Sequence, residues 1–92
     1  MRLASIVLAA AAAAALAGCS SELPEAGGAE AALYVQRCGT CHPPYRPGVM
    51  TAKMWEAMVA RMEQEMDRRG LELPAADKDR ILAYLARNGS TQ

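Results

Sequence analysis

The cysteine and histidine side chains of this 92-residue chain are concentrated in one stretch, RCGTCHPPYRPGVM, which spans residues 37–50. The stretch contains two of the chain's three cysteines, Cys38 and Cys41, and its only histidine, His42. Two thiols three residues apart, followed at once by an imidazole, suit three kinds of site. They can attach a haem covalently, ligate a metal ion, or act as a redox-active dithiol.

The spacing favours covalent haem attachment, because C-x-x-C-H is the pattern of c-type haem sites. Residues three apart share one face of a helical turn, so the thiols of Cys38 and Cys41 can add to the two vinyl groups of one haem. The imidazole of His42 then follows where it can ligate the iron. We therefore predict one covalently attached haem c, with Cys38 and Cys41 as its thioethers and His42 as the proximal iron ligand.

The two other chemistries fit the sequence less well. A structural zinc site takes four protein ligands. Only Cys38, Cys41 and His42 are available as ligands, because Cys19 is expected to be lipidated. A thioredoxin-like dithiol lies near a βαβ pattern, and the sequence shows no strands. A plain disulfide between the two cysteines would leave His42 without a role.

The N-terminal residues have the features of an export signal. A basic start precedes an alanine-rich run, residues 3–16, which is too short and too weakly apolar for a transmembrane helix. The run ends in LAGC, which resembles the lipobox of bacterial lipoproteins. The resemblance implies cleavage before Cys19, lipidation of Cys19 and a periplasmic, membrane-anchored protein, and Ser20 favours the outer membrane. The alternative is an ordinary secretory signal with a chance cysteine.

These features divide the chain into a removed signal peptide (1–18), a lipidated tether (19–29) and a folded domain (30–89). The tether is predicted because its residues are small, polar, proline or glycine. A domain of roughly 60 residues has a small hydrophobic core and usually needs an additional stabilising feature, such as a disulfide, a metal ion or a cofactor. With no phenylalanine and one tryptophan, a large apolar cofactor would fill that core. The 10 basic and 10 acidic residues form no basic patch, which argues against a nucleic-acid partner.

Helical periodicity predicts an all-α domain with three main helices, over residues 29–41, 50–69 and about 74–87. Thr51 is the expected N-cap of the second helix. The proline-rich loop 43–48 cannot be helical. Pro44 or Pro47 is expected to offer a carbonyl to the second ring nitrogen of His42. Tyr45 and Arg46 are candidates to bind a haem propionate, unless the loop is simply solvated.

A methionine is the remaining candidate for the sixth iron ligand, because the chain has no second histidine. Residues 54–66 carry four methionines at intervals of four, on one arc of the second helix. Met62 lies at the centre of this arc and is the predicted distal ligand, with Met58 as the runner-up. The other methionines are expected to fill gaps in the core.

Residues 28–89 resemble the small, single-haem form of the cytochrome c family. The resemblance rests on the helix before C-x-x-C-H, the proline loop, a distal methionine and a closing helix with ILAYLARNG. Relatives often show a tryptophan, a valine four residues on and a methionine three further, which here are Trp55, Val59 and Met62. Larger cytochromes c take the ligand from a loop well downstream, an arrangement that would favour Met66 over Met50.

The resemblance implies a cytochrome c-like domain whose three helices surround one covalently bound haem. A haem with histidine and methionine ligands has no free position for a substrate, so we expect an electron carrier and not an enzyme. The expected activity is one-electron transfer between a periplasmic dehydrogenase or reductase and another redox partner, such as an oxidase, with the carrier tethered to the membrane. The alternative is a five-coordinate haem that acts as a sensor or in a peroxidase-like reaction.

Overall fold

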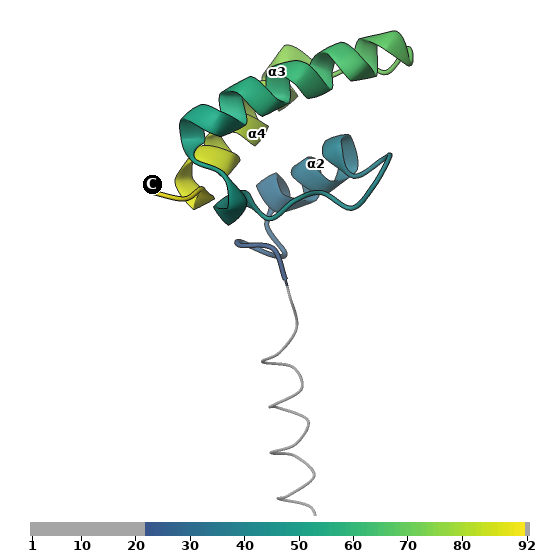
Figure 1. Ribbon diagram of the computed structural model, residues 1–92. Helices are drawn as coiled ribbons and strands as arrows, with labels where there is room; N and C mark the ends of the chain where they lie inside the picture. The colour runs from purple at the N-terminus through teal and green to yellow at the C-terminus, as the bar shows by residue number, and fades with distance from the viewer. Residues whose placement is uncertain (1–21, 92) are drawn as a thin grey trace, which may run out of the picture.

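The computed structural model describes residues 22–91, which form an all-helical domain (Figure 1). The elements in chain order are the helix α2 (Ala29–Cys38), the 3-10 turn η1 (Pro47–Val49), and the helices α3 (Ala52–Arg68) and α4 (Ala75–Asn88). Extended pairing within the described residues is limited to an isolated bridge between Thr51 and Ser90. The predicted all-α fold with three main helices is confirmed. The predicted signal peptide (1–18) and Cys19 lie outside the described residues.

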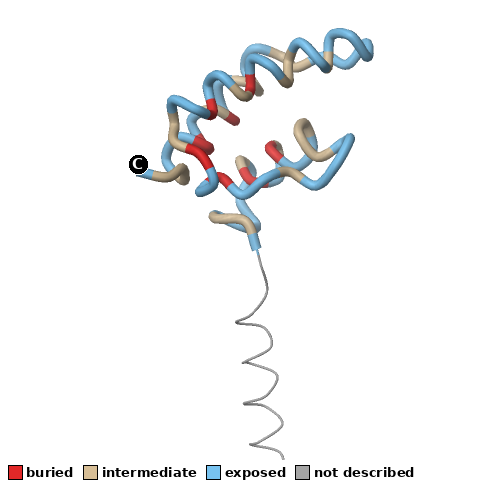
Figure 2. Tube along the Cα trace, in the orientation of Figure 1, coloured by how far each residue is buried: buried red, intermediate tan, exposed pale blue. Residues whose placement is uncertain are grey.

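Helix α4 is the centre of the packing. It contacts α2, α3 and η1, whereas the backbones of α2 and α3 lie apart (Figure 1). The aromatic ring of Tyr34 on α2 meets Trp55 edge-on at 6.2 Å and Tyr84 at 5.6 Å between centroids, arrangements that aromatic pairs prefer. Figure 2 shows the buried residues gathered toward one end of the helices, and the second half of α3 and the loop after α2 carry none. The core therefore closes one end of the bundle only.

Helix α3 begins as predicted, because the Thr51 hydroxyl accepts a hydrogen bond of 3.2 Å from the backbone N–H of Met54. The prediction that all four methionines of residues 54–66 lie on one buried arc was partly wrong, since Met54 is 53% exposed. The indole N–H of Trp55 donates to the carbonyl of Pro47 at 2.8 Å, in the core beside η1. This contact turns Trp55 and Val59 to the centre of the buried face and leaves Met54 at its edge.

Residues 22–28, the described part of the predicted tether, lie against α4 and the proline loop. The Tyr84 hydroxyl donates to the Pro24 carbonyl at 2.9 Å. The Arg87 guanidinium donates to both oxygens of the Glu25 carboxylate at 2.8 Å. The guanidinium of Arg46 donates to the Glu22 carbonyl at 2.8 Å. These four hydrogen bonds hold residues 22–28 against the rest of the domain.

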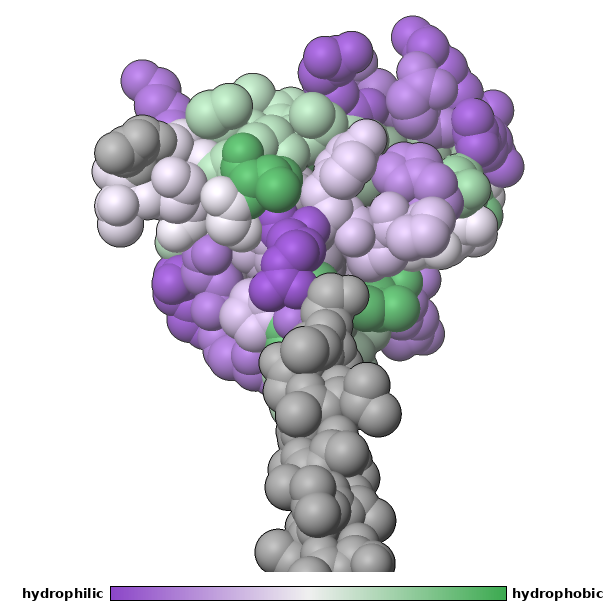
Figure 3. All heavy atoms as spheres, turned by 60° about the horizontal axis from the view of Figure 1, so that its bottom comes forward, coloured by the Kyte–Doolittle hydropathy of each residue, from purple (hydrophilic) through white to green (hydrophobic). Residues whose placement is uncertain are grey.

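Figure 3 views the side of the molecule that was the bottom of Figure 1, where hydrophilic side chains alternate with small hydrophobic groups. The large hydrophobic side chains that are exposed come from separate segments of the chain: Val35, Tyr45, Val49, Met54 and Leu71. Single exposed hydrophobic residues are ordinary on a soluble surface. None of the helices in the described part of the chain is long and apolar enough to span a bilayer.

The pairing of Glu25 predicts a pH-dependent contribution to stability. Hydrogen bonds from Arg87, and then from Asn88, lower the pKa of the Glu25 carboxyl from 4.5 to about 2. A carboxylate with a lowered pKa stabilises the fold above its unfolded pKa, and this stabilisation is lost as the pH falls through the folded pKa. We expect Glu25→Gln to lower the urea midpoint of unfolding at pH 7, and the difference to shrink between about pH 4.5 and 2.

The matched control is Glu22→Gln, which removes the same charge three residues away. Glu22 contacts the domain through its backbone carbonyl, so this variant should keep the midpoint of the unsubstituted protein at every pH. Urea unfolding followed by circular dichroism measures both variants. A Glu25→Gln difference that stays constant down to pH 2, or an equal effect of Glu22→Gln, would contradict the assignment.

Candidate functional site

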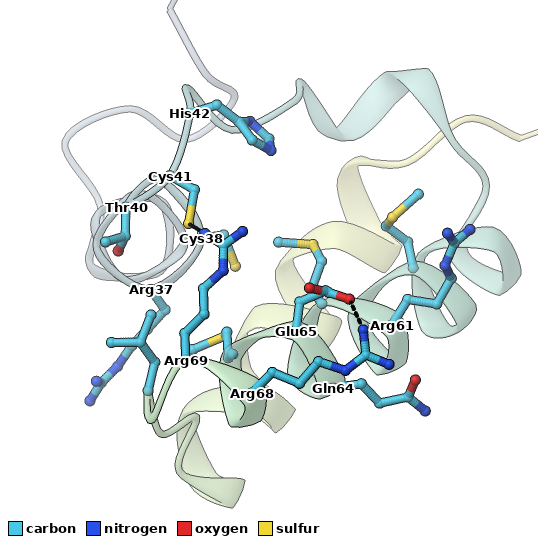
Figure 4. A pocket seen from close by; sticks show the side chains of 14 residues that line it. Arg37, Cys38, Thr40, Cys41, His42, Arg61, Gln64, Glu65, Arg68 and Arg69 are labelled. Atoms are coloured by element: carbon cyan, nitrogen blue, oxygen red, sulfur yellow. Dashed lines mark hydrogen bonds and ion pairs between the residues drawn. The ribbon is translucent and has the colours of Figure 1, made fainter.

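A cavity of about 550 Å³ opens between the C-terminal end of α2, the loop that follows it and the second half of α3 (Figure 4). Its volume is within the range of about 300–1,000 Å³ that is typical of cofactor sites. The predicted haem-binding residues Cys38, Cys41 and His42 all line it. Three methionines of α3 line it as well: Met58, Met62 and Met66. The structure thus brings the thiols, the imidazole and three thioethers around one space.

The first predicted helix was too long, because α2 ends at Cys38 and not at residue 41. The N–H of Gly39 makes the last helical hydrogen bond, to the Val35 carbonyl at 2.9 Å. A Cβ atom on Gly39 would lie 2.5 Å from that same oxygen, so the turn needs glycine. Cys38 is therefore half-buried on the last turn, and Cys41 is exposed on the bend that follows. Figure 4 shows both side chains on the side of the segment that faces α3.

The imidazole of His42 is oriented by a backbone carbonyl. Its Nδ1 lies 2.9 Å from the carbonyl oxygen of Pro43. A carbonyl can only accept a hydrogen bond, so this contact selects the tautomer of the neutral ring in which Nδ1 carries the proton and Nε2 has the lone pair that a metal ion needs. The predicted acceptors, Pro44 and Pro47, were wrong: the ring turns back onto the adjacent residue, and Pro47 accepts from Trp55 instead.

The environment of the thiols does not resemble that of a redox-active dithiol. Burial raises the pKa of the Cys38 thiol to about 11, whereas reactive cysteines have a lowered pKa. Both Cys38 and Cys41 are free thiols, the form in which a cysteine adds to a vinyl group. Residues 22–91 also contain no group of three or more histidine, cysteine, aspartate or glutamate side chains placed to hold a metal ion.

The methionines divide into those at the cavity and those elsewhere. Met50 is buried in the core and Met54 is exposed, and neither lines the cavity. The structure leaves Met58, Met62 and Met66 as possible distal ligands, because all three are lining residues. The choice of Met62 among them stays a prediction.

Four arginines and one glutamate also line the cavity, and the sequence reasoning did not single them out: Arg37, Arg61, Arg68, Arg69 and Glu65. The predicted propionate partners, Tyr45 and Arg46, are not lining residues, and Arg46 contacts the Glu22 carbonyl instead. The sequence contained one indication that two of these arginines lie together. Arg61 and Arg68 are seven residues apart, and this spacing places them on one face of α3.

The donor set fits a haem. The thiols of Cys38 and Cys41 would hold the macrocycle covalently, the Nε2 atom of His42 is free to ligate iron, and thioether sulfurs from α3 line the same cavity. Arginine side chains at the cavity suit the carboxylates that a haem carries. What the bound haem supplies is an iron that changes its charge by one electron.

Comparison with known proteins identifies a family. Residues 34–92 match the family model described as "Dihaem cytochrome c". The matched region covers well over half of the chain and includes the whole cysteine–histidine stretch, α3 and α4. A search of the curated proteins and a search of the solved structures gave no match.

Proposed function

This chain belongs to the dihaem cytochrome c family, and on that basis we propose that it is a one-electron carrier with a single haem c. Membership alone makes the chain a c-type cytochrome, which carries haem and exchanges electrons with a redox protein. We further infer that the chain carries one haem. The family name denotes two, but the 92 residues contain one C-x-x-C-H sequence, at Cys38, Cys41 and His42.

The observation that supports this proposal most strongly is the cavity with an imidazole and thioethers in one lining. His42 would ligate the iron through Nε2, and we infer that Met62 completes the coordination. A methionine ligand raises the reduction potential of the haem. With both axial positions taken, the iron has no position for a substrate, so the proposed protein is an electron carrier and not an enzyme.

The N-terminal sequence supports a carrier that is held at a membrane. Removal of residues 1–18 and lipidation of Cys19 would anchor it in the periplasm, and Ser20 favours the outer membrane. Only residues 20 and 21 separate Cys19 from Glu22, whose carbonyl accepts a hydrogen bond from Arg46 of the domain. Three residue steps reach at most about 11 Å. The haem domain would therefore stay at the membrane surface, close to a dehydrogenase, reductase or oxidase partner.

The absorption spectrum tests the proposed ligation. A carrier with a methionine ligand should show, when oxidised, the weak near-infrared band of an iron–sulfur bond. When reduced, it should not change its spectrum on addition of carbon monoxide, because neither axial position is free. Carbon monoxide binding together with a missing band would contradict the carrier and favour a five-coordinate sensor or a peroxidase-like protein.

A further inference from the structure

The charge around the cavity is opposite in sign to the charge of the rest of the domain. Residues 22–91 contain nine basic and ten acidic residues, a formal net charge of −1. Four of the basic residues and one of the acidic residues line the cavity, a net charge of +3. Five basic and nine acidic residues lie elsewhere, a net charge of −4. A domain that is slightly acidic as a whole is therefore basic where the haem is expected.

The lining arginines differ in how far carboxylates neutralise them. Two of them form ion pairs, Arg37 with Asp77 at 2.7 Å and Arg68 with Glu65 at 2.6 Å. The Arg68 side chain is 71% exposed, and such surface pairs contribute little, so it stays available to a partner. The other two are exposed and have no carboxylate partner within residues 22–91: Arg61 and Arg69.

The contact between Arg69 and Cys41 shows which edge of a haem this charge would adjoin. The guanidinium of Arg69 donates to the sulfur of Cys41 at 3.0 Å (Figure 4). A thioether at Cys41 joins this sulfur to a former vinyl group, so Arg69 would lie at the vinyl edge of the haem, opposite the propionates. Both Cys41 and Arg69 are exposed. The positive charge is therefore expected where the edge of the haem comes close to solvent.

We propose that three exposed arginines, Arg61, Arg68 and Arg69, form a docking surface for a redox protein that carries carboxylates around its own cofactor. The inference rests on the proposed function, which puts a haem in this cavity. Opposite charges steer two proteins into one relative orientation and raise their association rate. The net charge of −4 elsewhere on the domain disfavours other orientations of the same partner.

The first test follows the oxidation of the reduced haem protein by ferricyanide, a small anion, in stopped-flow measurements at increasing salt. One electron passes from the ferrous haem to ferricyanide, which becomes ferrocyanide. If the anion meets the docking surface, the rate constant should fall as salt rises, because salt screens the attraction. If the net charge of −1 decides instead, the rate constant should rise with salt.

Variants assign the effect to the arginines. Arg69→Gln should lower the rate constant at low salt several-fold and flatten its dependence on salt, and Arg69→Lys should retain both because it keeps the charge. The matched control is Lys53→Gln, which removes the same charge from the same helix at a residue that does not line the cavity. The salt dependence is the quantity to compare, because a changed reduction potential alters the rate constant but not its dependence on salt.

Binding of poly-L-glutamate, measured by calorimetry at low salt, tests the same surface without electron transfer. The haem protein should bind it, the variant that combines Arg68→Gln with Arg69→Gln should bind it more weakly, and Lys53→Gln should bind it as before. A rate constant that rises with salt, no binding of poly-L-glutamate, or equal effects of Lys53→Gln and Arg69→Gln would overturn this inference and leave the electron carrier standing. Absence of haem from the unsubstituted protein would overturn the proposed function itself.

Discussion

A variant in which Cys38→Ala and Cys41→Ala are combined is expected to carry no covalently bound haem. The two thiols line the same cavity as His42, and a thioether is the only bond in this account that survives denaturation. Haem staining after denaturing electrophoresis should fall from a strong band to none. Neither His42 nor a methionine can retain the haem once the chain unfolds, because an iron–ligand bond depends on the fold.

Three matched variants make the result specific. Either single change, Cys38→Ala or Cys41→Ala, leaves one thiol and should give weaker staining that is still covalent. Cys19→Ala removes the third cysteine of the chain, which lies outside the haem motif, and should leave the staining per molecule unchanged. Staining that persists in the double variant would place the attachment elsewhere.

The second large effect is expected at Met62. Met62→Ala should abolish the near-infrared iron–sulfur band and open the reduced iron to carbon monoxide, because the proposed ligation takes its sulfur from Met62. Met58→Ala and Met66→Ala are the closest controls, since both residues line the same cavity on the same helix. Both should keep the band, and so should Met54→Ala, because Met54 is exposed and does not line the cavity.

The opposite pattern has a clear meaning. If Met62→Ala keeps its band and Met58→Ala or Met66→Ala loses it, the ligand is the methionine whose substitution removed the band. If every single variant keeps the band, methionines exchange as ligands, and the assignment to Met62 is wrong. Carbon monoxide binding by the unsubstituted protein would contradict methionine ligation as a whole.

The three helices could be predicted from the sequence, because each has its own hydrophobic periodicity and its own boundary residues. Thr51 caps α3, and Gly70 follows α3 with the positive φ that ends it. The end of α2 was missed because Leu33, Arg37 and Cys41 continue the helical spacing of four past the true boundary. The boundary is set instead by the close approach of Gly39 to the Val35 carbonyl, which periodicity does not report.

Long-range contacts account for the other differences. The composition of residues 19–29 suits a tether, but Glu25 pairs with Arg87, which lies 62 positions away in the sequence. Local composition contains no information about such a pair. In the same way, Arg69 comes to lie beside Cys41 only because the end of α3 lies opposite the loop after α2 (Figure 4). The two cysteines and the histidine could be identified because they lie within five consecutive residues, so their spacing alone indicates the haem site.

Mass spectrometry of the intact, denatured protein, produced with its own signal sequence and a haem-maturation system, is the most direct measurement of the central claim. It weighs the chain together with everything that is bound to it covalently. The account predicts the mature chain plus the mass of one haem, lost in the variant without Cys38 and Cys41. A chain that carries no haem, or one that carries two, would contradict a single haem c attached at this site.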